Sequence, residues 1–564
     1  MSFVRAHRCR WIFALLASVP AALASAAEVP APAGARAQES RDLGLVLLVA
    51  VDQLRRDRFD PALPGGLGRF AREGRVYTEA MLDHAVSETC PGHAVMLTGR
   101  HPGAVGIPSN HFVERNGVGS TYCVGDRNPD SLVIGGEDRA GRGRSPRLMR
   151  VDTLGSWMKA ARPGTRVYSV SGKDRGAIAS VGRGADVAYW YEDEDGFTTS
   201  HFYADELPAW VRQWNGREPT RDGLFRELPD TWDHQRGDPG PHGRVDDYHA
   251  ESAERKRVSG HPIRDDDPAT FAKNVYRSPF LDRLSLDFAR ELVAREGLGR
   301  GAAPDLLVLA LSATDIVGHN YGPESHEARD ALERLDEELG IFMTELEARV
   351  GKGRVLSVLT ADHGVLTLPD WLQETGRSRC RLEGGRMGLR WPAIALGIRM
   401  HRQFAPLFSW PVAWLSSNGR GLMINRQAAA KHGVALEEVA AAAKGYLESY
   451  EGIERVWTRT EILEGQSEQA RLYRNSFDPQ RSPDLEVQVA PTCLISKRSY
   501  GTSHGSPHAY DRAVPLAFLG PGIAAAQVPG AAATVDIAPT LAAILGLELP
   551  DGLDGRVLFG AEPH

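Results

Sequence analysis

The sequence lacks the features that mark several classes of protein. Beyond its N-terminus it has no apolar run of the roughly 20 residues that a membrane-spanning helix needs. Its formal net charge is only −7, with both signs mixed along the chain, so no basic field predicts a nucleic-acid partner. None of its five cysteines stands in a Cys-x-x-Cys pair, which argues against a thiolate zinc site. What remains, at 42% hydrophobic and 25% charged residues, is typical of a globular protein.

The N-terminus has an apolar run of a different kind. Three arginines precede an apolar run from Trp11 to Leu23, and small residues follow it. The run is interrupted by Pro20 and is too short to span a membrane, so we interpret residues 1–27 as a secretory signal peptide. Residues 28–42 then form an N-terminal lead. The mature chain is expected to be periplasmic or secreted, without a membrane anchor.

Loss of the signal peptide leaves an even number of cysteines, namely Cys90, Cys123, Cys380 and Cys493. In an exported chain this number permits disulfides, but the sequence does not indicate which cysteines pair.

Continuous apolar runs alternate with helical patterns along the chain. The runs are at 43–51, 166–171, 305–312, 355–360 and 514–519, and the helical patterns at 151–161, 280–295, 326–350 and 534–545. This alternation predicts an α/β fold with a doubly wound, mostly parallel sheet flanked by helices, forming one catalytic domain over residues 43–564. Two irregular stretches, about 183–275 and 370–500, are expected to be insertions that form a cap or small subdomain; the second contains a helix at 436–450.

Polar residues that can bind metals stand at or beside the ends of these apolar runs. They are Asp52, Asp315, His319, Asp362, His363 and His504. Ligand sites in open α/β sheets lie outside the carboxyl ends of the strands, so we expect these six side chains to meet at one edge. Three carboxylates and three imidazoles suffice for two divalent metal sites, and this mixture of ligands suits zinc, although manganese or iron occupancy stays open.

A site with two metals stabilises displacement at phosphorus and needs an oxygen nucleophile. The stretch SETCPGH, residues 87–93, offers Thr89, Cys90 and His93. The hydroxyl of Thr89 fits best, because a thiolate would bind a neighbouring metal tightly. Pro91 suits the first turn of a helix, whose start would aim backbone N–H groups at a phosphate. We interpret His93 as a structural histidine.

Six motifs, in order, resemble the alkaline phosphatase superfamily, in particular its zinc-dependent, PafA-type branch, which is related to the type I phosphodiesterase/nucleotide pyrophosphatase family. They are VAVDQLRRD, SETCPGHAVMLTGRHPGAVGIPSNHF, SGKDRGA, DIVGH, TADHG and GTSHGSPHAYDRAVPLAFLGPG. The similarity extends over nearly the whole mature chain.

The resemblance implies a role for each site residue. Thr89 would be the nucleophile that takes up the phosphoryl group as a phosphothreonine. Two zinc ions would be bound, one by Asp52, Asp362, His363 and Thr89, the other by Asp315, His319 and His504. Phosphate would be bound by Asn110, Lys173 and Arg175.

The resulting hypothesis is a zinc-dependent phosphomonoesterase acting on small organic phosphate monoesters. The Lys-x-Arg pair marks the monoesterase branch, whereas a solvated turn is the alternative interpretation of Lys173 and Arg175. A phosphodiesterase or nucleotide pyrophosphatase on the same scaffold is the alternative function, and a non-catalytic metal-binding member is a further one. A sulfatase does not fit, because its Cys-x-Pro-x-Arg motif is missing around Cys90.

Overall fold

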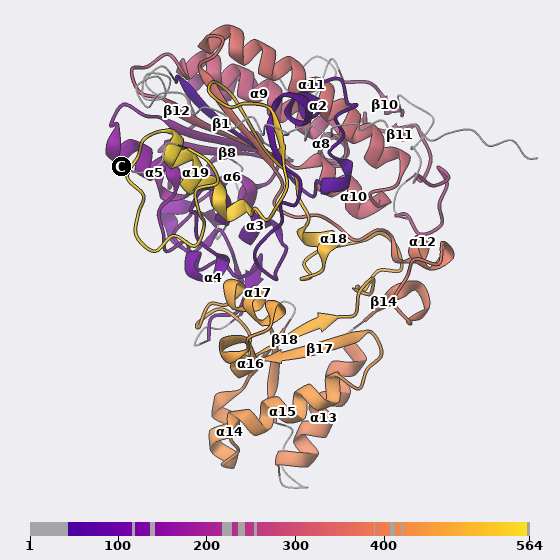
Figure 1. Ribbon diagram of the computed structural model, residues 1–564. Helices are drawn as coiled ribbons and strands as arrows, with labels where there is room; N and C mark the ends of the chain where they lie inside the picture. Colours follow the sequence, from indigo (N-terminus) through magenta and orange to yellow (C-terminus); the bar gives the residue numbers. More distant parts are fainter. Residues whose placement is uncertain are drawn as a thin grey trace, which may run out of the picture.

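A nine-stranded sheet forms the centre of the larger lobe (Figure 1). The computed structural model describes residues 43–560 except 116–118, 136–141, 194, 217–227, 235–242, 253–255, 389, 406–411 and 419–420. The predicted signal peptide and lead, 1–27 and 28–42, lie outside the described residues. The strands, in spatial order, are β21 (Ala526–Val528), β2 (Arg75–Tyr77), β20 (Leu516–Leu519), β13 (Val355–Thr360), β1 (Leu45–Val51), β12 (Asp305–Leu311), β7 (Val167–Ser171), β8 (Val187–Glu192) and β9 (Gly196–Thr198).

The five central strands β13, β1, β12, β7 and β8 are mutually parallel, which confirms the prediction of a mostly parallel sheet. Strand β20 runs antiparallel to β13, and β9 antiparallel to β8. The direction of β20 matters for the site, because the beginning of an antiparallel strand lies at the same edge as the carboxyl ends of its parallel neighbours.

Helices cover both faces of the sheet. Every residue of β1 is buried, and its side chains alternate between two cores: Leu45 and Leu47 point into one, Val46 and Leu48 into the other. The first core lies under α2 (Gly66–Glu73), α7 (Ala209–Asn215), α8 (Pro268–Tyr276), α9 (Phe280–Glu296) and α11 (His326–Val350). The second lies under α3 (Thr89–Met96), α5 (Leu154–Ala161), α6 (Asp174–Val181) and α19 (Ile537–Ile544). Burial on both faces explains the unbroken apolar sequence of the central strands.

A second sheet lies in the lower part of Figure 1, in the order β15 (Leu415–Asn418), β16 (Gly421–Ile424), β18 (Leu485–Val489) and β17 (Ile453–Thr458). Its helices are α13 (Arg390–Phe404), α14 (Arg426–His432), α15 (Leu436–Leu447), α16 (Arg459–Glu464) and α17 (Glu468–Ser476). This lobe has its own apolar core, which includes Trp414, Val439 and Val456.

Short helices and two-stranded pairs complete the described part of the fold. They are α4 (Pro102–Val105), α10 (Ala313–Tyr321), α12 (Pro369–Glu374) and α18 (Ala509–Arg512), with the strand pairs β3 (His111–Phe112) and β4 (Thr121–Tyr122), β5 (Gly125–Asp126) and β6 (Gly143–Arg144), β10 (Thr231–Trp232) and β11 (His261–Pro262), and β14 (Arg386–Met387) and β19 (Leu494–Ile495).

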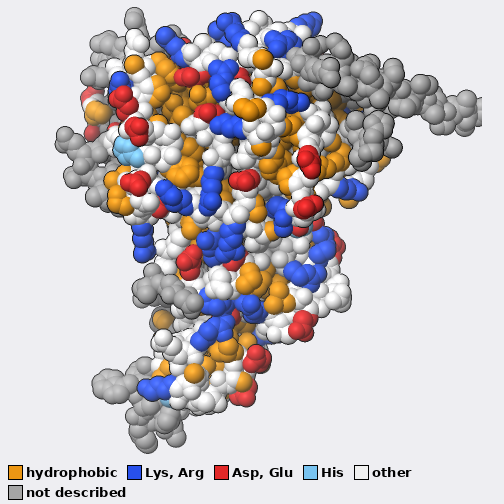
Figure 2. Space-filling view, turned by 90° about the vertical axis from the view of Figure 1, so that its left-hand side faces the viewer, with side chains coloured by type: hydrophobic (Ala, Val, Ile, Leu, Met, Phe, Trp, Pro, Cys, Tyr) orange, Lys and Arg blue, Asp and Glu red, His pale blue; other side chains and the backbone are white. Residues whose placement is uncertain are grey.

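The surface is mixed in charge. On the face shown in Figure 2, Lys and Arg side chains are interspersed with Asp and Glu. None of the helices in the described ranges has the length and apolar character needed to cross a membrane.

Two disulfides settle the pairing that the sequence left open: Cys90 pairs with Cys123, and Cys380 with Cys493.

We expect the double variant Cys90→Ser/Cys123→Ser to lose about 3–4 kcal/mol of unfolding free energy, because the cross-link closes a loop between residues 33 positions apart. Urea unfolding followed by tryptophan fluorescence measures this. Chemical reduction should lower the unfolding free energy of the double variant by less than that of the wild type, because the variant already lacks one of the two disulfides. Equal unfolding midpoints for variant and wild type would contradict the expectation.

Candidate functional site

The six side chains singled out in the sequence meet at one edge of the large sheet. Asp52 directly follows β1, Asp362 and His363 follow β13, and Asp315 lies in the first turn of α10 just after β12. His319 lies one turn further along α10, and His504 lies in the loop before α18, the short helix that precedes the antiparallel strand β20. Five are at least nine-tenths buried as residues; His319 is half-buried.

Asp52, Asp362 and His363 form a first cluster of possible ligands. The Nε2 atom of His363 lies 3.4 Å from Oδ1 of Asp52 and 3.2 Å from Oδ2 of Asp362. One ligand atom from each residue lies within 4.8 Å of the other two. This spacing suits three ligands of a single ion.

Asp315 is the centre of the second cluster. Its Oδ1 lies 3.1 Å from Nε2 of His319 and 3.6 Å from Nε2 of His504. The rings of His363 and His504 stack with their centroids 3.5 Å apart, and Asp315, His363 and His504 also meet the 4.8 Å criterion together. The two clusters are therefore contiguous, as a pair of neighbouring ions requires.

The outer ring nitrogen of each histidine is held by a backbone carbonyl. Nδ1 of His319 lies 2.8 Å from the backbone oxygen of Thr502, and Nδ1 of His504 lies 2.7 Å from that of Ser87. Nδ1 of His363 lies 3.0 Å from the backbone oxygen of the next residue, Gly364. A carbonyl oxygen can only accept a hydrogen bond, so each Nδ1 carries the hydrogen and donates it, and each Nε2 offers a lone pair towards the carboxylates. This arrangement is typical of histidines that bind metals.

Three buried polar atoms of the first cluster have no hydrogen-bond partner among the described residues: Oδ1 of Asp52, Oδ2 of Asp362 and Nε2 of His363. Leaving such atoms unpaired costs about 1–3 kcal/mol each, and more when they are charged. Together with the oxygen and nitrogen donor set, these unpaired atoms fit a divalent cation.

The electrostatics of the cluster also favour added positive charge. Burial, and then the negative charge of Asp52, raises the pKa of Asp362. Burial also raises the pKa of Asp315, but the nearby His319 and Lys173 outweigh it and lower that pKa overall. Burial lowers the pKa of His363 to about 3, so this ring stays neutral and able to bind a metal at ordinary pH.

Thr89 is the first residue of α3 and is buried at the same edge. Ser87 on one side of it accepts a hydrogen bond from His504, and His93 on the other side places Nε2 3.6 Å from Oδ2 of Asp362. A Cβ added at Gly92 would lie 2.2 Å from the backbone oxygen of Asp362, so only glycine lets α3 approach this closely. The stretch from Ser87 to His93 thus packs against both ligand clusters.

Asn110 lies beside the start of α3. Its Oδ1 accepts a hydrogen bond from the N–H of Cys90 at 2.8 Å, and its own N–H donates to Oε2 of Glu88 at 2.7 Å. One of the backbone N–H groups at the start of α3, which the sequence predicted to face a phosphate, is therefore bonded to Asn110. The backbone oxygen of Asn110 accepts a hydrogen bond from the N–H of Cys123. Because Cys123 is joined to Cys90 in α3, the disulfide holds the loop of Asn110 against this helix.

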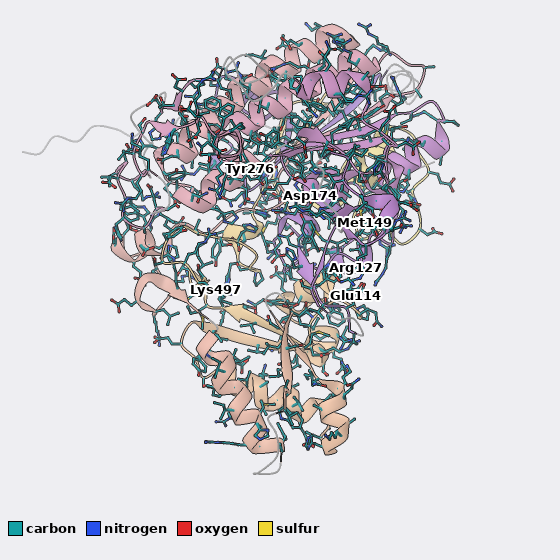
Figure 3. The ribbon with its side chains drawn as sticks, turned by 180° about the vertical axis from the view of Figure 1, so that it is seen from behind. Glu114, Arg127, Met149, Asp174, Tyr276 and Lys497 are labelled. Atoms are coloured by element: carbon teal, nitrogen blue, oxygen red, sulfur yellow. A yellow bond between two sulfur atoms is a disulfide. The ribbon has the colours of Figure 1, made fainter. Side chains whose placement is uncertain are left out.

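Lys173 lies in the turn between β7 and α6, directly before the helix, and Arg175 is the second residue of α6; between them is Asp174, which Figure 3 labels. The ammonium group of Lys173 contacts Asp52 and lies 2.6 Å from Oδ2 of Asp315, so it bridges the two clusters. Burial lowers its pKa, but the charges of Asp315 and Asp52 outweigh burial and raise it. Lys173 is only 4% exposed, which excludes the alternative of a solvated turn for this residue.

Arg175 is half-buried, and its Nε has no hydrogen-bond partner within the described part of the chain. Burial lowers its pKa, but the surrounding groups Tyr122, Asp174 and Asp52 raise it overall. The guanidinium therefore remains charged near Asp52.

Sequence reasoning missed Gln53, which links the two clusters. Its backbone has φ of 69°, its N–H donates to Oδ1 of Asp362 at 3.1 Å, and its Nε2 donates to Oδ1 of Asp315 at 2.5 Å. A Cβ at Gly318 would lie 1.9 Å from Oε1 of Gln53, which explains the glycine of the Asp-Ile-Val-Gly-His motif. No sequence pattern marks a left-handed backbone at a glutamine.

Two other histidines near the site, His93 and His508, make contacts outside the two ligand clusters. His93 contacts the hydroxyl of Ser180 at 3.2 Å through Nδ1, and His508 contacts the backbone oxygen of Val489 at 2.9 Å through Nε2.

Comparison with known proteins gives a consistent result. Residues 46–511 match the family described as type I phosphodiesterase/nucleotide pyrophosphatase. The chain is 32% identical to alkaline phosphatase PhoD of Zymomonas mobilis subsp. mobilis, over 91% of this chain and 87% of the relative. It is also 32% identical to alkaline phosphatase PhoK of Sphingomonas sp, over 91% of this chain and 90% of the relative. The crystal structure of alkaline phosphatase PafA superimposes with a TM-score of 0.81 at 25% identity, covering 92% of this chain and 98% of that chain.

Proposed function

The chain belongs to the type I phosphodiesterase/nucleotide pyrophosphatase family of the alkaline phosphatase superfamily, and from this premise we propose that it is a zinc-dependent phosphomonoesterase. It is an enzyme of the alkaline phosphatase type, related to PhoD, PhoK and PafA over about nine-tenths of its length. Its proposed substrates are small organic phosphate monoesters, and its proposed location is the periplasm or the medium.

The observation that most supports this proposal is the meeting of three carboxylates and three imidazoles at the edge where α3 begins with Thr89. Asp52, Asp362, His363 and the Thr89 hydroxyl would bind one zinc ion; Asp315, His319 and His504 would bind the other. When bound, the two ions supply positive charge that lowers the pKa of a hydroxyl or a water and neutralises a departing oxygen.

The proposed reaction has two displacements at phosphorus. The Thr89 oxygen forms a bond to phosphorus as the bond to the ester oxygen breaks, and the alcohol leaves with a proton. Water then attacks the phosphothreonine, which breaks the bond to Thr89 and releases inorganic phosphate. Thr89 recovers its proton, so the enzyme returns to its starting state.

The remaining polar groups would bind the phosphoryl oxygens, which carry the charge in a loose transition state. Asn110 is held beside the start of α3 through its Oδ1, and the N–H groups of the same amide would donate to a phosphoryl oxygen. Lys173 and Arg175 add two positive charges, which favours the extra negative charge of a monoester over a diester.

Two alternative functions make different predictions. A phosphodiesterase or nucleotide pyrophosphatase is favoured by the family name, but in this chain Lys173 contacts the ligand clusters instead of pointing away from them. A non-catalytic metal-binding protein would bind the ions without turnover.

A metal analysis combined with an ester panel tests the proposal. We expect purified wild-type protein to contain zinc, and its kcat/KM for an aryl phosphate monoester to exceed that for the matching diester by roughly 10²-fold or more, as differential stabilisation of the added charge predicts. Chelation should abolish both activities and zinc should restore them. A diester preference would favour the phosphodiesterase, and zinc binding without turnover would favour the non-catalytic alternative.

A further inference from the structure

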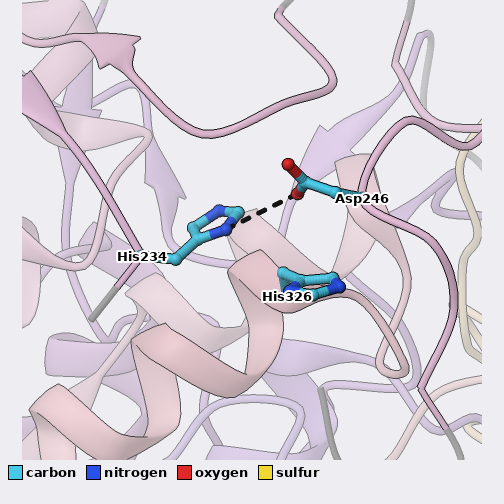
Figure 4. A group of neighbouring side chains, drawn as sticks. All are labelled: His234, Asp246 and His326. Atoms are coloured by element: carbon cyan, nitrogen blue, oxygen red, sulfur yellow. Dashed lines mark ion pairs between the residues drawn. The ribbon is translucent and has the colours of Figure 1, made fainter. Parts of the chain in front are cut away.

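A second group of metal-binding side chains lies away from the sheet edge, where the insertion meets the beginning of α11. His234 follows β10, His261 begins β11, and Glu327 is the second residue of α11. Figure 4 shows His234 together with its neighbours Asp246 and His326. All five residues are among those that the structure describes.

The three innermost atoms have the spacing of ligands on one ion. Nε2 of His261 lies 3.1 Å from Oε1 of Glu327, and Nε2 of His234 lies 3.5 Å from the same oxygen. Ligands at about 2.1 Å on a tetrahedral zinc ion lie roughly 3.4 Å apart. The three side chains have exposed fractions of only 6% for His234, 7% for His261 and 0% for Glu327.

The outer nitrogens of both histidines face polar groups that would orient them. Nδ1 of His234 lies 3.5 Å from Oδ1 of Asp246, and Nδ1 of His261 lies 3.3 Å from the hydroxyl of Tyr321. A metal-binding histidine usually gives its second N–H to a carboxylate or another polar acceptor, which leaves the inner nitrogen for the ion.

The cluster also contains an unpaired buried oxygen. Oε2 of Glu327 has no hydrogen-bond partner among the described residues, although the side chain is fully buried. A carboxylate that accepts its bonds through one oxygen only is costly in such a place. A bound cation would satisfy the second oxygen.

We propose that His234, His261 and Glu327 bind a third divalent transition metal ion, with zinc as the best match to a set of two histidines and one glutamate. Its fourth ligand would be water. Both histidines belong to the insertion at about 183–275, so the ion would cross-link this insertion to the junction between α10 and α11. Since α10 carries Asp315 and His319, the ion would stabilise the scaffold of the active site without taking part in its chemistry.

Metal counting tests this proposal. After saturation with zinc and removal of the excess, mass spectrometry of the metal should find one ion fewer per chain in His261→Ala and in Glu327→Gln than in the wild type. The control is His249→Ala, in the same insertion, whose side chain is 64% exposed; it should bind as many ions as the wild type. Equal counts in all four proteins would overturn the proposal.

Crystals of the wild type give a second measurement that does not depend on the folding of a variant. Anomalous scattering at the zinc edge should show a peak bounded by His234, His261 and Glu327, separate from any peak at Asp52 and Asp315. Its absence from zinc-soaked crystals would overturn the proposal. Neither measurement uses turnover, so both outcomes are independent of the proposed phosphatase activity.

Discussion

Replacement of Thr89 by alanine is expected to lower kcat/KM for a phosphate monoester by roughly 10³-fold or more, while most of the bound zinc is retained. The reason is that Thr89 supplies the only attacking oxygen in the proposed first displacement, whereas the aspartates and histidines that would bind the ions stay in place. The measurements are steady-state hydrolysis of an aryl phosphate and elemental analysis of the same preparation.

Two control variants, each a small truncation of a buried threonine, distinguish loss of the nucleophile from a local change in the packing of α3. Thr89→Ser keeps the hydroxyl and should stay within about tenfold of the wild type, because an oxygen nucleophile is still present. Thr98→Ala removes a buried hydroxyl just beyond the same helix, which donates to the backbone oxygen of Ala94 at 2.7 Å, and should leave kcat/KM nearly unchanged. Full activity in Thr89→Ala would rule out Thr89 as the nucleophile.

Intact-mass measurement under rapid acid quench provides an independent check on the same residue. A phosphorylated species should accumulate in the wild type or in Thr89→Ser if the second displacement is slow, and it should be missing in Thr89→Ala. Phosphorylation of Thr89→Ala at another residue would contradict the proposed mechanism.

The central strands were predictable because their burial on both faces imposes a local pattern. Runs of apolar residues at 43–51, 305–312 and 355–360 became β1, β12 and β13 with shifts of at most two residues at their ends. The polar residues after these strands were predictable to meet for the same reason: parallel strands end at a common edge. His504 required the additional fact that β20 is antiparallel, which its apolar sequence does not encode.

The parts that could not be predicted depend on contacts between distant segments. Gln53 acts through a left-handed backbone that glutamine rarely adopts. The pairing of Cys90 with Cys123 is one of three connectivities that four cysteines allow. His261 and Glu327 are 66 positions apart, so no spacing motif marks them as neighbours.

The contact of Lys173 with Asp52 and Asp315 could not be predicted from the sequence either. The sequence indicates a cation near the phosphate but not which carboxylates it contacts. In the structure its ammonium lies between the two ligand clusters, where it partly neutralises their charge. A substrate phosphate would have to share the ammonium group of Lys173 with the two aspartates. Removing the positive charge by mutation tests how much it contributes to catalysis.

The double variant Lys173→Ala/Arg175→Ala is expected to lower kcat/KM for an aryl phosphate monoester by roughly 10²–10³-fold and to change that for the matching diester by less than about tenfold. The two side chains contribute positive charge that stabilises the extra negative charge of a monoester, and a diester lacks that charge. Steady-state kinetics with the two esters of the same leaving group measures the ratio directly. Elemental analysis of the variant shows in parallel whether the ions stay bound once Asp52 and Asp315 lose their ammonium partner.

A matched control removes the same charge from a neighbouring surface. Lys159→Ala/Arg183→Ala deletes one lysine and one arginine close in sequence to the first pair; Lys159 pairs with Asp186, and Arg183 is exposed. This variant should keep the wild-type ratio of monoester to diester hydrolysis, because neither side chain contacts the ligand clusters. A monoester preference that survives in Lys173→Ala/Arg175→Ala with its zinc intact would contradict the role assigned to the pair. Burial favours an uncharged lysine, but the charges of Asp315 and Asp52 outweigh burial and raise the pKa of Lys173. A selective loss of monoester hydrolysis would therefore show that the positive charge of the pair acts on the substrate and does not only stabilise the fold.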